Sequence, residues 1–410
     1  MNRIIIVGGG ASGIAAALSA AQAAPRAEIT VLEGLDRIGK KILATGNGRC
    51  NLGNEEISAD CYFGARRDRL AELISDMPTE KTVEFFKECG LLCAPDEAGR
   101  LYPYCRQASM VLDVLLLALQ RRRIAVECDC RVTAIQYKKG RFQVKTEAGE
   151  RFEADRVILA TGGKAAPKQG VTGVGYTLAE SFGHRKTALF PCLVPIKCRS
   201  GALKGLKGIR VQCRTTLLED GAPAASEIGE LQLTDYGVSG IPALQLSCTL
   251  GALRGKAEIS VDFFPETDEE TLYAQLKNRR DALDGEALET VFLGTVHKRI
   301  LYTLMKEAGL EPLSRKAKTL EDGELRALAR KCKDWRLPVE GTLSWDQAQV
   351  TGGGIPLQEV TDDFESVYQK GLYLTGELLD AVGLCGGYNL HWAWCSGIRA
   401  GQAAAQEEDA

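Results

Sequence analysis

The sequence predicts an α/β protein, and three observations near its N-terminus carry this prediction. An apolar run at residues 4–7 is followed directly by a glycine-rich turn at residues 8–13. An alanine-rich stretch with helical character comes next, and a second apolar run ends at Glu33, twenty residues past Gly13. A strand, a tight turn, a helix and a second strand in this order are typical of a parallel βαβ unit.

The glycines of this turn predict a binding site for a dinucleotide. Gly8 allows the tight turn out of the strand, Gly10 allows the backbone to approach a pyrophosphate, and Gly13 allows close packing of helix and strand. The N-terminus of the helix faces the phosphates, where its unpaired N–H groups attract negative charge. Glu33 stands at the sequence spacing typical of the acidic residue whose carboxylate accepts hydrogen bonds from the adenosine ribose.

The composition favours a soluble, cytoplasmic enzyme that acts on a small molecule. The chain has 410 residues and a formal net charge of -3, which gives no electrostatic reason to expect nucleic acid or a membrane as partner. Its 14 cysteines are scattered without a C-x-x-C pattern and only three histidines accompany them. We therefore expect no metal site and no redox dithiol, and we expect reduced thiols. No apolar run is long enough to span a bilayer.

The middle of the chain predicts an inserted domain. From about residue 191 short β-prone runs alternate with Gly and Pro, and a charged, helix-prone stretch follows. Strand-like and glycine-rich sequence returns only near the C-terminus. The expected organisation is a discontinuous cofactor domain at residues 1–190 and 345–410, and an inserted substrate domain at 191–344 that is β-rich over 191–265 and helical over 266–337.

A second dense motif, A-T-G-N-G-R-C-N, occupies residues 44–51. Its glycines allow the main chain to approach a planar ligand, Arg49 offers a charged fork, and Asn51 can both donate and accept hydrogen bonds. A tight turn with a cap is the alternative interpretation. For Cys50, packing beside a cofactor is favoured over a nucleophilic role, because no histidine lies nearby in the sequence.

Two further glycine signals lie where strand-like runs end. A buried run at 156–160 stops at Thr161-Gly162-Gly163, and a run at 371–375 precedes Gly376-Glu377. Glycines at the carboxyl ends of strands mark the crevice in which a dinucleotide lies. A glycine-rich helix start follows at residues 386–389.

These motifs resemble those of the HI0933-like flavoprotein family, which is also described as the bile-acid-inducible reductase and aminoacetone oxidase group of FAD enzymes. The resemblance extends over essentially the whole chain. The motifs that show this resemblance are G-G-G-A-S-G, T-G-N-G-R-C-N, A-T-G-G, residues 175–184 and 233–244, V-T-G-G-G at 350–354, and the segment from G-E-L-L-D to G-G-Y-N-L. It implies a glutathione-reductase-type FAD-binding Rossmann domain with an inserted β-barrel and a helical substrate region.

The resemblance also implies which residues bind FAD. Those expected at the pyrophosphate, the ribose, the following turn and the adenine are Gly8, Gly10, Ala11, Ser12, Gly13, Glu33, Arg37, Lys40 and Val132. Those expected at the flavin ring, the ribityl chain and the crevice are Thr45, Gly46, Arg49, Cys50, Asn51, Thr161, Gly162, Gly163, Gly376, Glu377, Gly386, Gly387, Tyr388, Asn389 and Leu390.

The catalytic expectations follow from flavin chemistry. Hydride moves through N5 of the ring, and negative charge then develops near N1 and O2. The helix start at residues 387–389 would direct N–H groups and its dipole toward that charge, with Tyr388 and Asn389 among the catalytic residues. The family usually has glycine at Asn47 and glutamine at His391. Candidate proton donors are His391, Tyr388 and Tyr236, although a structural histidine is the commoner case.

Three functions remain open on the sequence alone. The leading one is an FAD-dependent oxidoreductase that reduces a conjugated enone, such as a 3-dehydro-bile acid, with NADH or NADPH. Because no second GxGxxG motif is present, a nicotinamide would enter the flavin cleft only transiently. The alternatives are an amine oxidase that uses oxygen on aminoacetone-like substrates, and a non-catalytic flavin-binding module.

Overall fold

The structure, a computed structural model, describes residues 2–64 and 66–406 and divides into two compact units. Unit 1 comprises Met1–Phe190 and Gln349–Ala410, and unit 2 comprises Pro191–Ala348. Each unit has its own hydrophobic core. The second boundary lies four residues beyond position 345, where the sequence analysis placed it.

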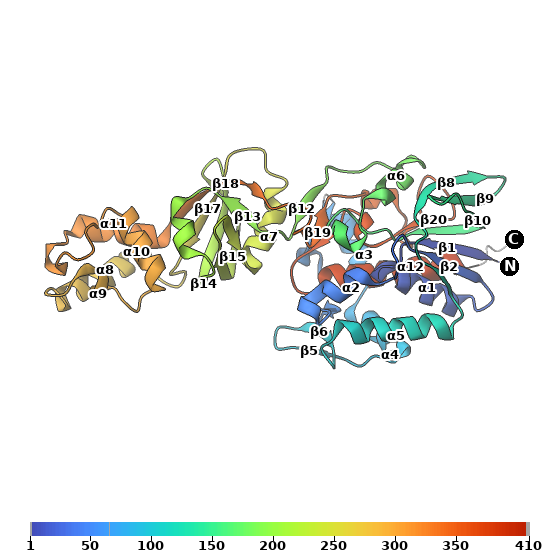
Figure 1. The fold of residues 1–410 in the computed structure, drawn as a ribbon, viewed down its shortest axis with the longest axis horizontal. Helices are drawn as coiled ribbons and strands as arrows, with labels where there is room; N and C mark the ends of the chain where they lie inside the picture. The colour runs from blue at the N-terminus through green and yellow to red at the C-terminus, as the bar shows by residue number, and fades with distance from the viewer. Residues whose placement is uncertain (1, 65, 407–410) are drawn as a thin grey trace. The chain divides into compact units, whose positions relative to one another are not determined.

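Unit 1 is built on a five-stranded parallel sheet (Figure 1). The strand order is β20 (Leu372–Leu374), β11 (Arg156–Leu159), β1 (Arg3–Val7), β2 (Glu28–Leu32) and β7 (Ala125–Glu127). The strands read as nearly continuous apolar runs because a parallel sheet is covered on both faces. This sheet, with its glycine-rich turn after β1, confirms the predicted Rossmann-type fold class.

The first and last helices of unit 1 pack against each other (Figure 1). Helix α1 spans Ala11–Ala23 and helix α12 spans Tyr388–Ala405. At Gly397 and Gly401 of α12, an added Cβ atom would collide with the backbone of Ser12 and Ala16 in α1. Glycine at these positions therefore lets the C-terminal helix complete the N-terminal domain.

The remaining elements of unit 1 cover this sheet or extend from it. An antiparallel sheet contains β8 (Val132–Lys138), β9 (Arg141–Thr146) and β10 (Arg151–Ala154). The other helices are α2 (Lys40–Ala44), α3 (Arg67–Ser75), α4 (Thr79–Cys89), α5 (Ala108–Arg121) and α6 (Val174–Glu180). Short strands are β3 (Gly53–Asn54), β4 (Tyr62–Phe63), β5 (Cys93–Pro95), β6 (Arg100–Pro103), β19 (Val350–Gly352) and β21 (Val382–Gly383), and β12 (Phe190–Cys192) crosses the unit boundary.

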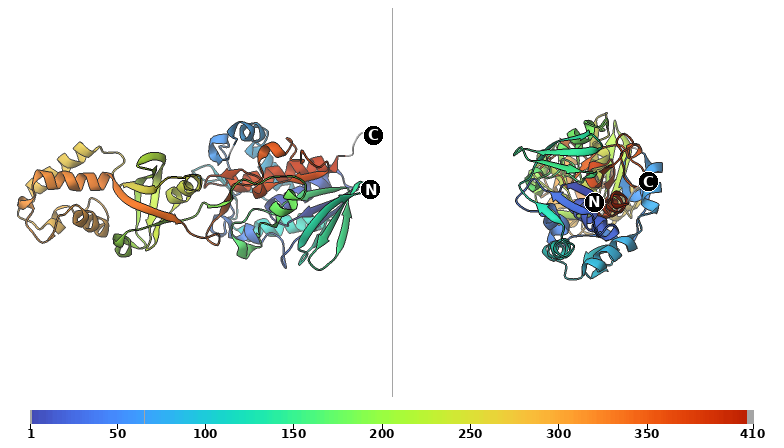
Figure 2. Two further views of the ribbon diagram at one scale, coloured as in Figure 1. Left: turned by 90° about the horizontal axis from the view of Figure 1, so that it is seen from above. Right: turned by 90° about the vertical axis from the view of Figure 1, so that its right-hand side faces the viewer.

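Unit 2 contains a closed barrel and a helical group. The barrel order is β13 (Ile196–Cys198), β16 (Gly237–Ser239), β15 (Ala222–Leu233), β14 (Arg210–Glu219), β17 (Ala257–Asp262) and β18 (Trp335–Thr342). Helix α7 (Ile241–Leu250) packs on the barrel. Figure 2 shows the helical group at one end of the barrel, formed by α8 (Glu269–Ala282), α9 (Leu288–Val291), α10 (Lys298–Glu307) and α11 (Asp322–Lys333).

The strand that closes the barrel was not expected from the sequence. The helical region was predicted to reach residue 337, but α11 ends at Lys333 and β18 begins at Trp335. A proline within a strand argues against strand structure, and Pro338 lies inside β18. Pairing of β18 with β17 and β13, which are distant in sequence, overrides that local signal.

The expectation that all thiols are reduced is wrong for one pair. Cys192 and Cys248 form a disulfide across 56 residues of sequence, with their Cα atoms 4.9 Å apart. Folding brings the two residues together, and a pair so far apart in the sequence has no spacing pattern by which it could be predicted. The other 12 cysteines lie outside this disulfide.

Within the described ranges, no helix has both the length and the apolar character needed to cross a membrane.

Candidate functional site

The glycine-rich turn after β1 has the geometry that a pyrophosphate site requires. Gly8 adopts φ +107°, and a Cβ atom there would lie 2.5 Å from the carbonyl oxygen of Ala160. A Cβ atom on Gly13 would collide with the carbonyl oxygen of Gly8, so only glycine lets α1 approach the strand. Around Gly10, by contrast, no atom lies within 4 Å of the position of a Cβ atom. This open space beside the helix start is where a phosphate fits.

The N-terminus of α1 faces this space with free donors. Gly10 is the N-cap and supplies no side-chain acceptor. The first hydrogen bond within the helix runs from the Ile14 N–H to the Gly10 carbonyl, at 2.9 Å. The N–H groups of Ala11, Ser12 and Gly13 precede it and have no partner within the helix. Together with the helix dipole they provide the features that attract an anion, as the sequence predicted for this turn.

Glu33 lies beside the same turn. One of its carboxylate oxygens accepts the Gly9 N–H at 2.8 Å, and the other accepts the Leu35 N–H at 2.9 Å. These bonds orient the carboxylate and leave further lone pairs for the hydroxyls of a ribose. The Cys130 N–H donates to the Glu33 carbonyl at 2.8 Å, which brings the start of β8 and Val132 to the adenosine end of the site.

Two lysines follow the turn after β2, one predicted from the sequence to bind the cofactor and one not predicted. The Gly39 N–H donates to the Gly9 carbonyl at 2.8 Å, so α2, which begins at Lys40, starts beside the glycine turn. Arg37 is exposed on this turn. Lys41 was not singled out from the sequence, yet its ammonium lies 2.6 Å from the carboxylate of Glu377.

Glu377 is the centre of a polar network at the carboxyl ends of β11 and β20. Its other oxygen accepts the N–H and the hydroxyl of Thr351, both at 2.9 Å. The Thr351 hydroxyl in turn accepts the N–H groups of Lys164 and Ala165. A Cβ atom on Gly163 would collide with the side chains of Thr351 and Glu377, so glycine at this position lets these segments meet. The V-T-G-G-G motif was the sequence signal for Thr351.

The loop at residues 45–51 is held in a rare backbone conformation. The φ angles of Gly46, Asn47, Gly48 and Cys50 lie between +54° and +79°. Asparagine is among the residues that best tolerate the left-handed region, which explains how Asn47 replaces the glycine usual in the family. The Thr45 hydroxyl donates to the Ile42 carbonyl at 2.7 Å and ties the loop to the end of α2. Several strained residues in one loop are typical of a ligand site.

Two side chains of this loop point inward and differ in character. Burial raises the pKa of the Cys50 thiol to about 12, so this residue is an inert packing group. Asn51 has a buried amide oxygen without a hydrogen-bond partner among the described residues. That oxygen lies 2.5 Å from where a Cβ atom of Gly387 would stand. A buried, unpaired acceptor is costly unless a ligand donates to it, as the ring N–H of a flavin would.

The start of α12 meets this loop. Gly386 and Gly387 adopt φ +138° and +105°, and a Cβ atom on Gly387 would collide with the Gly53 carbonyl. The first hydrogen bond in the helix runs from the His391 N–H to the Gly387 carbonyl, at 2.9 Å. The N–H groups of residues 388–390 therefore remain free of intrahelical partners at the positive end of the dipole.

Asn389 uses its side chain to brace the preceding loop. Its amide oxygen accepts the Gly383 N–H at 2.8 Å, and its amide nitrogen donates to the Gly383 carbonyl at 2.7 Å. Asn389 was predicted to be a catalytic residue, but both polar atoms of its side-chain amide are engaged with the backbone of Gly383. Asn389 contributes instead by fixing the helix start, from which its backbone N–H projects.

His391 lies in the core, with 0% of its surface exposed. Its Nε2 lies 2.8 Å from the Met77 carbonyl, and its Nδ1 lies 3.2 Å from the Thr82 hydroxyl. Burial lowers the pKa of this imidazole, which keeps it neutral, with Nε2–H donating to Met77 and Nδ1 accepting from Thr82. Its role as proton donor stays a prediction that this geometry disfavours, because both nitrogens are used inside the protein.

The tyrosine candidates differ in their surroundings. The Tyr62 hydroxyl donates to the Tyr388 carbonyl at 3.1 Å, and the two rings form an edge contact. The phenol of Tyr388 is half-buried, and burial raises its pKa well above the ordinary range, so it is protonated at neutral pH. Tyr236 belongs to unit 2 and is 37% exposed.

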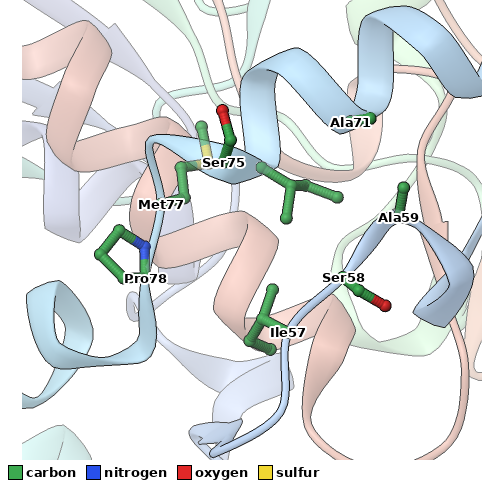
Figure 3. Close-up of a pocket in the computed structure, with 8 residues that line it drawn as sticks. Ile57, Ser58, Ala59, Ala71, Ser75, Met77 and Pro78 are labelled. Carbon is green, nitrogen blue, oxygen red and sulfur yellow. The ribbon is translucent and has the colours of Figure 1, made fainter.

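A pocket of about 300 Å³ lies elsewhere in unit 1, between α3 and the loop before β4 (Figure 3). Its lining is apolar apart from two serines and contains no charged residue: Ile57, Ser58, Ala59, Ala71, Ile74, Ser75, Met77 and Pro78. None of these residues belongs to the predicted cofactor set. Met77, which lines this pocket, is also the residue whose carbonyl contacts His391 in the first turn of α12. This hydrogen bond links the wall of the pocket to α12.

Comparisons with known proteins identify the family of this chain. A sequence model of the family described as "HI0933-like protein Rossmann domain" matches residues 2–403. The chain is 40% identical over 410 residues to a 3-dehydro-bile acid delta(4,6)-reductase of Clostridium scindens, covering 99% of this chain and 100% of that protein. It is 26% identical to a ribosomal RNA dihydrouridine synthase of Escherichia coli, covering 96% of this chain and 95% of that protein.

Solved structures show the same fold at low identity. A 3-ketosteroid-delta4-(5alpha)-dehydrogenase of Rhodococcus jostii superposes with a TM-score of 0.52 at 17% identity, covering 99% of this chain and 97% of that chain. A 3-ketosteroid delta1-dehydrogenase of Sterolibacterium denitrificans superposes with a TM-score of 0.52 at 13% identity, covering 99% of this chain and 100% of that chain. Unit 1 is a Rossmann-type FAD-binding domain, and the chain belongs to the HI0933-like family.

Proposed function

We propose that this FAD-dependent oxidoreductase reduces a carbon–carbon double bond conjugated to a carbonyl group. The substrate class is a 3-oxo steroid of the 3-dehydro-bile acid type, and the reductant is NADH or NADPH. The observation that carries the proposal is the 40% identity, over the full length, to a 3-dehydro-bile acid delta(4,6)-reductase.

The chemistry named by the more distant relatives points the same way. Dihydrouridine is uridine in which the ring double bond conjugated to a carbonyl has been reduced. Both kinds of relative are therefore named for the addition of hydrogen to a conjugated double bond, on very different substrates. This common reaction favours the reductase over the amine oxidase alternative.

The residues of unit 1 fit FAD at each part of the molecule. The space at Gly10 and the start of α1 would hold the pyrophosphate, Glu33 would hold the ribose, and the unpaired oxygen of Asn51 would accept from the flavin ring. Bound FAD supplies hydride transfer through the N5 atom of its ring. The free N–H groups at the start of α12 stabilise negative charge, and Asn389 and His391 hold that start in place.

Reduction of an enone adds a hydride to one carbon and a proton to its neighbour, so a proton donor is needed. We take Tyr388 as the candidate, because it is the first residue of α12, beside the 45–51 loop, and its phenol is only half-buried. A single general acid typically contributes a factor of about 10² to 10⁴ to the rate. Tyr388→Phe should therefore slow substrate reduction and leave flavin reduction by NAD(P)H unchanged.

Two half-reactions measured without oxygen test the proposal. The yellow holoprotein is first reduced with NADH or NADPH and is then mixed, still without oxygen, with a 3-oxo-4,6-diene bile acid or with unmodified ribosomal RNA. In a separate aerobic assay the oxidised holoprotein is mixed with aminoacetone. We expect rapid flavin reoxidation by the steroid and a reduced steroid product on mass spectrometry. Turnover confined to aminoacetone would establish the oxidase alternative. Dihydrouridine in the RNA would make nucleic acid the substrate.

A further inference from the structure

Two exposed arginines contact one buried tyrosine beside the 45–51 loop. The guanidinium of Arg49 lies 5.6 Å from the centre of the Tyr102 ring, and that of Arg106 lies 4.9 Å from it. Tyr102 is buried, whereas both arginines are exposed. Neither guanidinium has an ion-pair partner among the described residues, and Arg49 donates only to the carbonyl of Gly46. Two positive charges thus contact one ring, and no carboxylate among the described residues pairs with either of them.

The backbone fixes this pair firmly. The Leu52 N–H donates to the Leu101 carbonyl at 2.7 Å, which joins the loop that carries Arg49 to the strand that carries Tyr102. Arg106 ends a turn in which its N–H donates to the Pro103 carbonyl at 2.8 Å, and it adopts φ +53°. A left-handed conformation is unfavourable for arginine, and such strain is commonly retained at ligand sites.

Two exposed apolar residues lie on the segments that flank the strand of Tyr102. Leu92 and Tyr104 are 73% and 76% exposed, the highest values among the large hydrophobic residues of the described chain. They are neighbours, because the Tyr104 N–H donates to the Leu92 carbonyl at 2.8 Å. Exposed apolar residues that are close in the chain to unpaired arginines are complementary to an apolar molecule that ends in an anion.

The same loop connects this surface to the flavin site. Arg49 and Asn51 are two residues apart, so their Cα atoms are separated by at most about 7 Å. Arg49 projects outward, and the Asn51 amide is buried against Gly387. A molecule of steroid length that reaches the flavin with one end can therefore place its other end at the arginines.

We propose that Arg49 and Arg106, supported by Tyr102, form an anion clamp that binds the side-chain carboxylate of the steroid substrate while Leu92 and Tyr104 contact its apolar body. This assignment rests on the proposed function and narrows it to acidic rather than neutral steroids. Arg49 was expected from the sequence to bind the cofactor, and the clamp assigns it to the substrate instead.

Equilibrium binding to the FAD-loaded protein tests the clamp without any turnover. The probes are cholate, its methyl ester and the neutral steroid 4-androstene-3,17-dione. Loss of a charged hydrogen bond should weaken cholate binding roughly tenfold for each of Arg49→Ala and Arg106→Ala. Binding of the methyl ester and of the neutral steroid should change less than about twofold by the same scale. Arg106→Lys should restore only part of the loss, because lysine lacks the planar fork.

Arg121→Ala is the matched control, because it removes an exposed arginine from the last turn of α5 and lowers the net charge equally. It should bind cholate like the wild type. The clamp is wrong if the wild type binds cholate no better than the methyl ester or does not bind cholate at all, or if Arg121→Ala weakens binding as much as Arg106→Ala.

The phosphate of a nicotinamide dinucleotide is the other anion that two arginines could hold. A rise in the KM for NADPH but not for NADH in Arg106→Ala, with cholate affinity unchanged, would assign the pair to the reductant and overturn the substrate clamp. Failure of the proposed reaction is a separate outcome: the holoprotein would bind cholate through the arginines but reduce no enone.

Discussion

Glycine residues have different roles in the two units. In unit 1, glycines at positions 8, 13, 163 and 397 stand where any side chain would strike another segment. In unit 2, a Cβ atom would meet nothing within 4 Å at Gly201, Gly205, Gly208, Gly221, Gly285, Gly294, Gly309, Gly323 and Gly341. Many glycines of unit 2 therefore stand in open space, whereas these four glycines of unit 1 bring segments of the chain together.

This difference shows how each unit is specified. The predicted site of unit 1 is made largely of backbone N–H groups. The residue type is therefore constrained at only a few positions, and each of these tolerates only glycine. The barrel of unit 2 is held by apolar side chains such as Trp335 and Leu337, for which other apolar residues can substitute. Four changes, taken from the largest expected effect to the smallest, would break or sharpen this comparison.

Gly13→Val should have the largest effect, because its Cβ atom collides with a carbonyl oxygen that cannot move without distorting β1 or α1. We expect destabilisation of unit 1 by more than about 4 kcal/mol, in the range reserved for severe core disruption. Hydrogen exchange followed by mass spectrometry should show lost protection in β1, α1 and α12, while the barrel strands keep theirs. Wild-type protection in α1 would contradict the close packing.

Trp335→Ala tests unit 2 in the same way. Trp335 is 1% exposed and packs against Phe263 in the barrel core. Truncation of a buried tryptophan typically costs about 3 kcal/mol or more. Hydrogen exchange should show lost protection in β17 and β18 only, with flavin content and the FAD spectrum unchanged. Loss of FAD in this variant would show that unit 1 depends on unit 2 for its site.

Gly10→Val should separate binding from folding within unit 1. Because open space surrounds the position of its Cβ atom, the fold should survive, and the valine should occupy the space of the pyrophosphate. We expect FAD affinity to fall by about a hundredfold, which corresponds to roughly 2.7 kcal/mol. Flavin titration of the apoprotein measures the affinity, and circular dichroism checks the fold. Full flavin occupancy would show that the turn is misassigned.

The buried histidines should give the smallest effect, a dependence of stability on pH. Burial lowers the pKa of both His391 and His184, and for His184 it outweighs the carboxylate of Glu359, 3.0 Å away. Below the unfolded value of about 6.5 the unfolded chain takes up protons that the folded protein does not. The free energy of unfolding should therefore fall as pH drops below 6.5, by up to about 1.4 kcal/mol per pH unit for each histidine.

Urea unfolding at several pH values between 5.5 and 7.5 checks this slope. His391→Gln and His184→Gln should each flatten it by up to one proton, and they should lose little stability above pH 7, where both histidines are neutral. An unchanged slope in both variants would mean that neither histidine differs in pKa between the folded and unfolded states.

Much of unit 1 could be predicted from the sequence because its constraints are local. The turn at residues 8–13, the acidic residue at position 33 and the glycines after β11 and β20 were found by spacing alone. Lys41 was missed because its meaning depends on Glu377, which lies 336 residues away in the chain. His391 was predicted to be a candidate proton donor, but it lies in the core. Its position in a helix could not tell which side of that helix packs against the core.

The sequence by itself determined the βαβ turn, its dinucleotide site and the presence of an insert, because glycine spacing and hydrophobic periodicity act within a few residues. Tertiary structure alone decided that β18 closes the barrel, that Cys192 meets Cys248, and that Asn389 and His391 support the helix start from inside. It also brought Arg49 and Arg106 onto one tyrosine. Most of these contacts join residues too far apart in the chain for any local pattern to record.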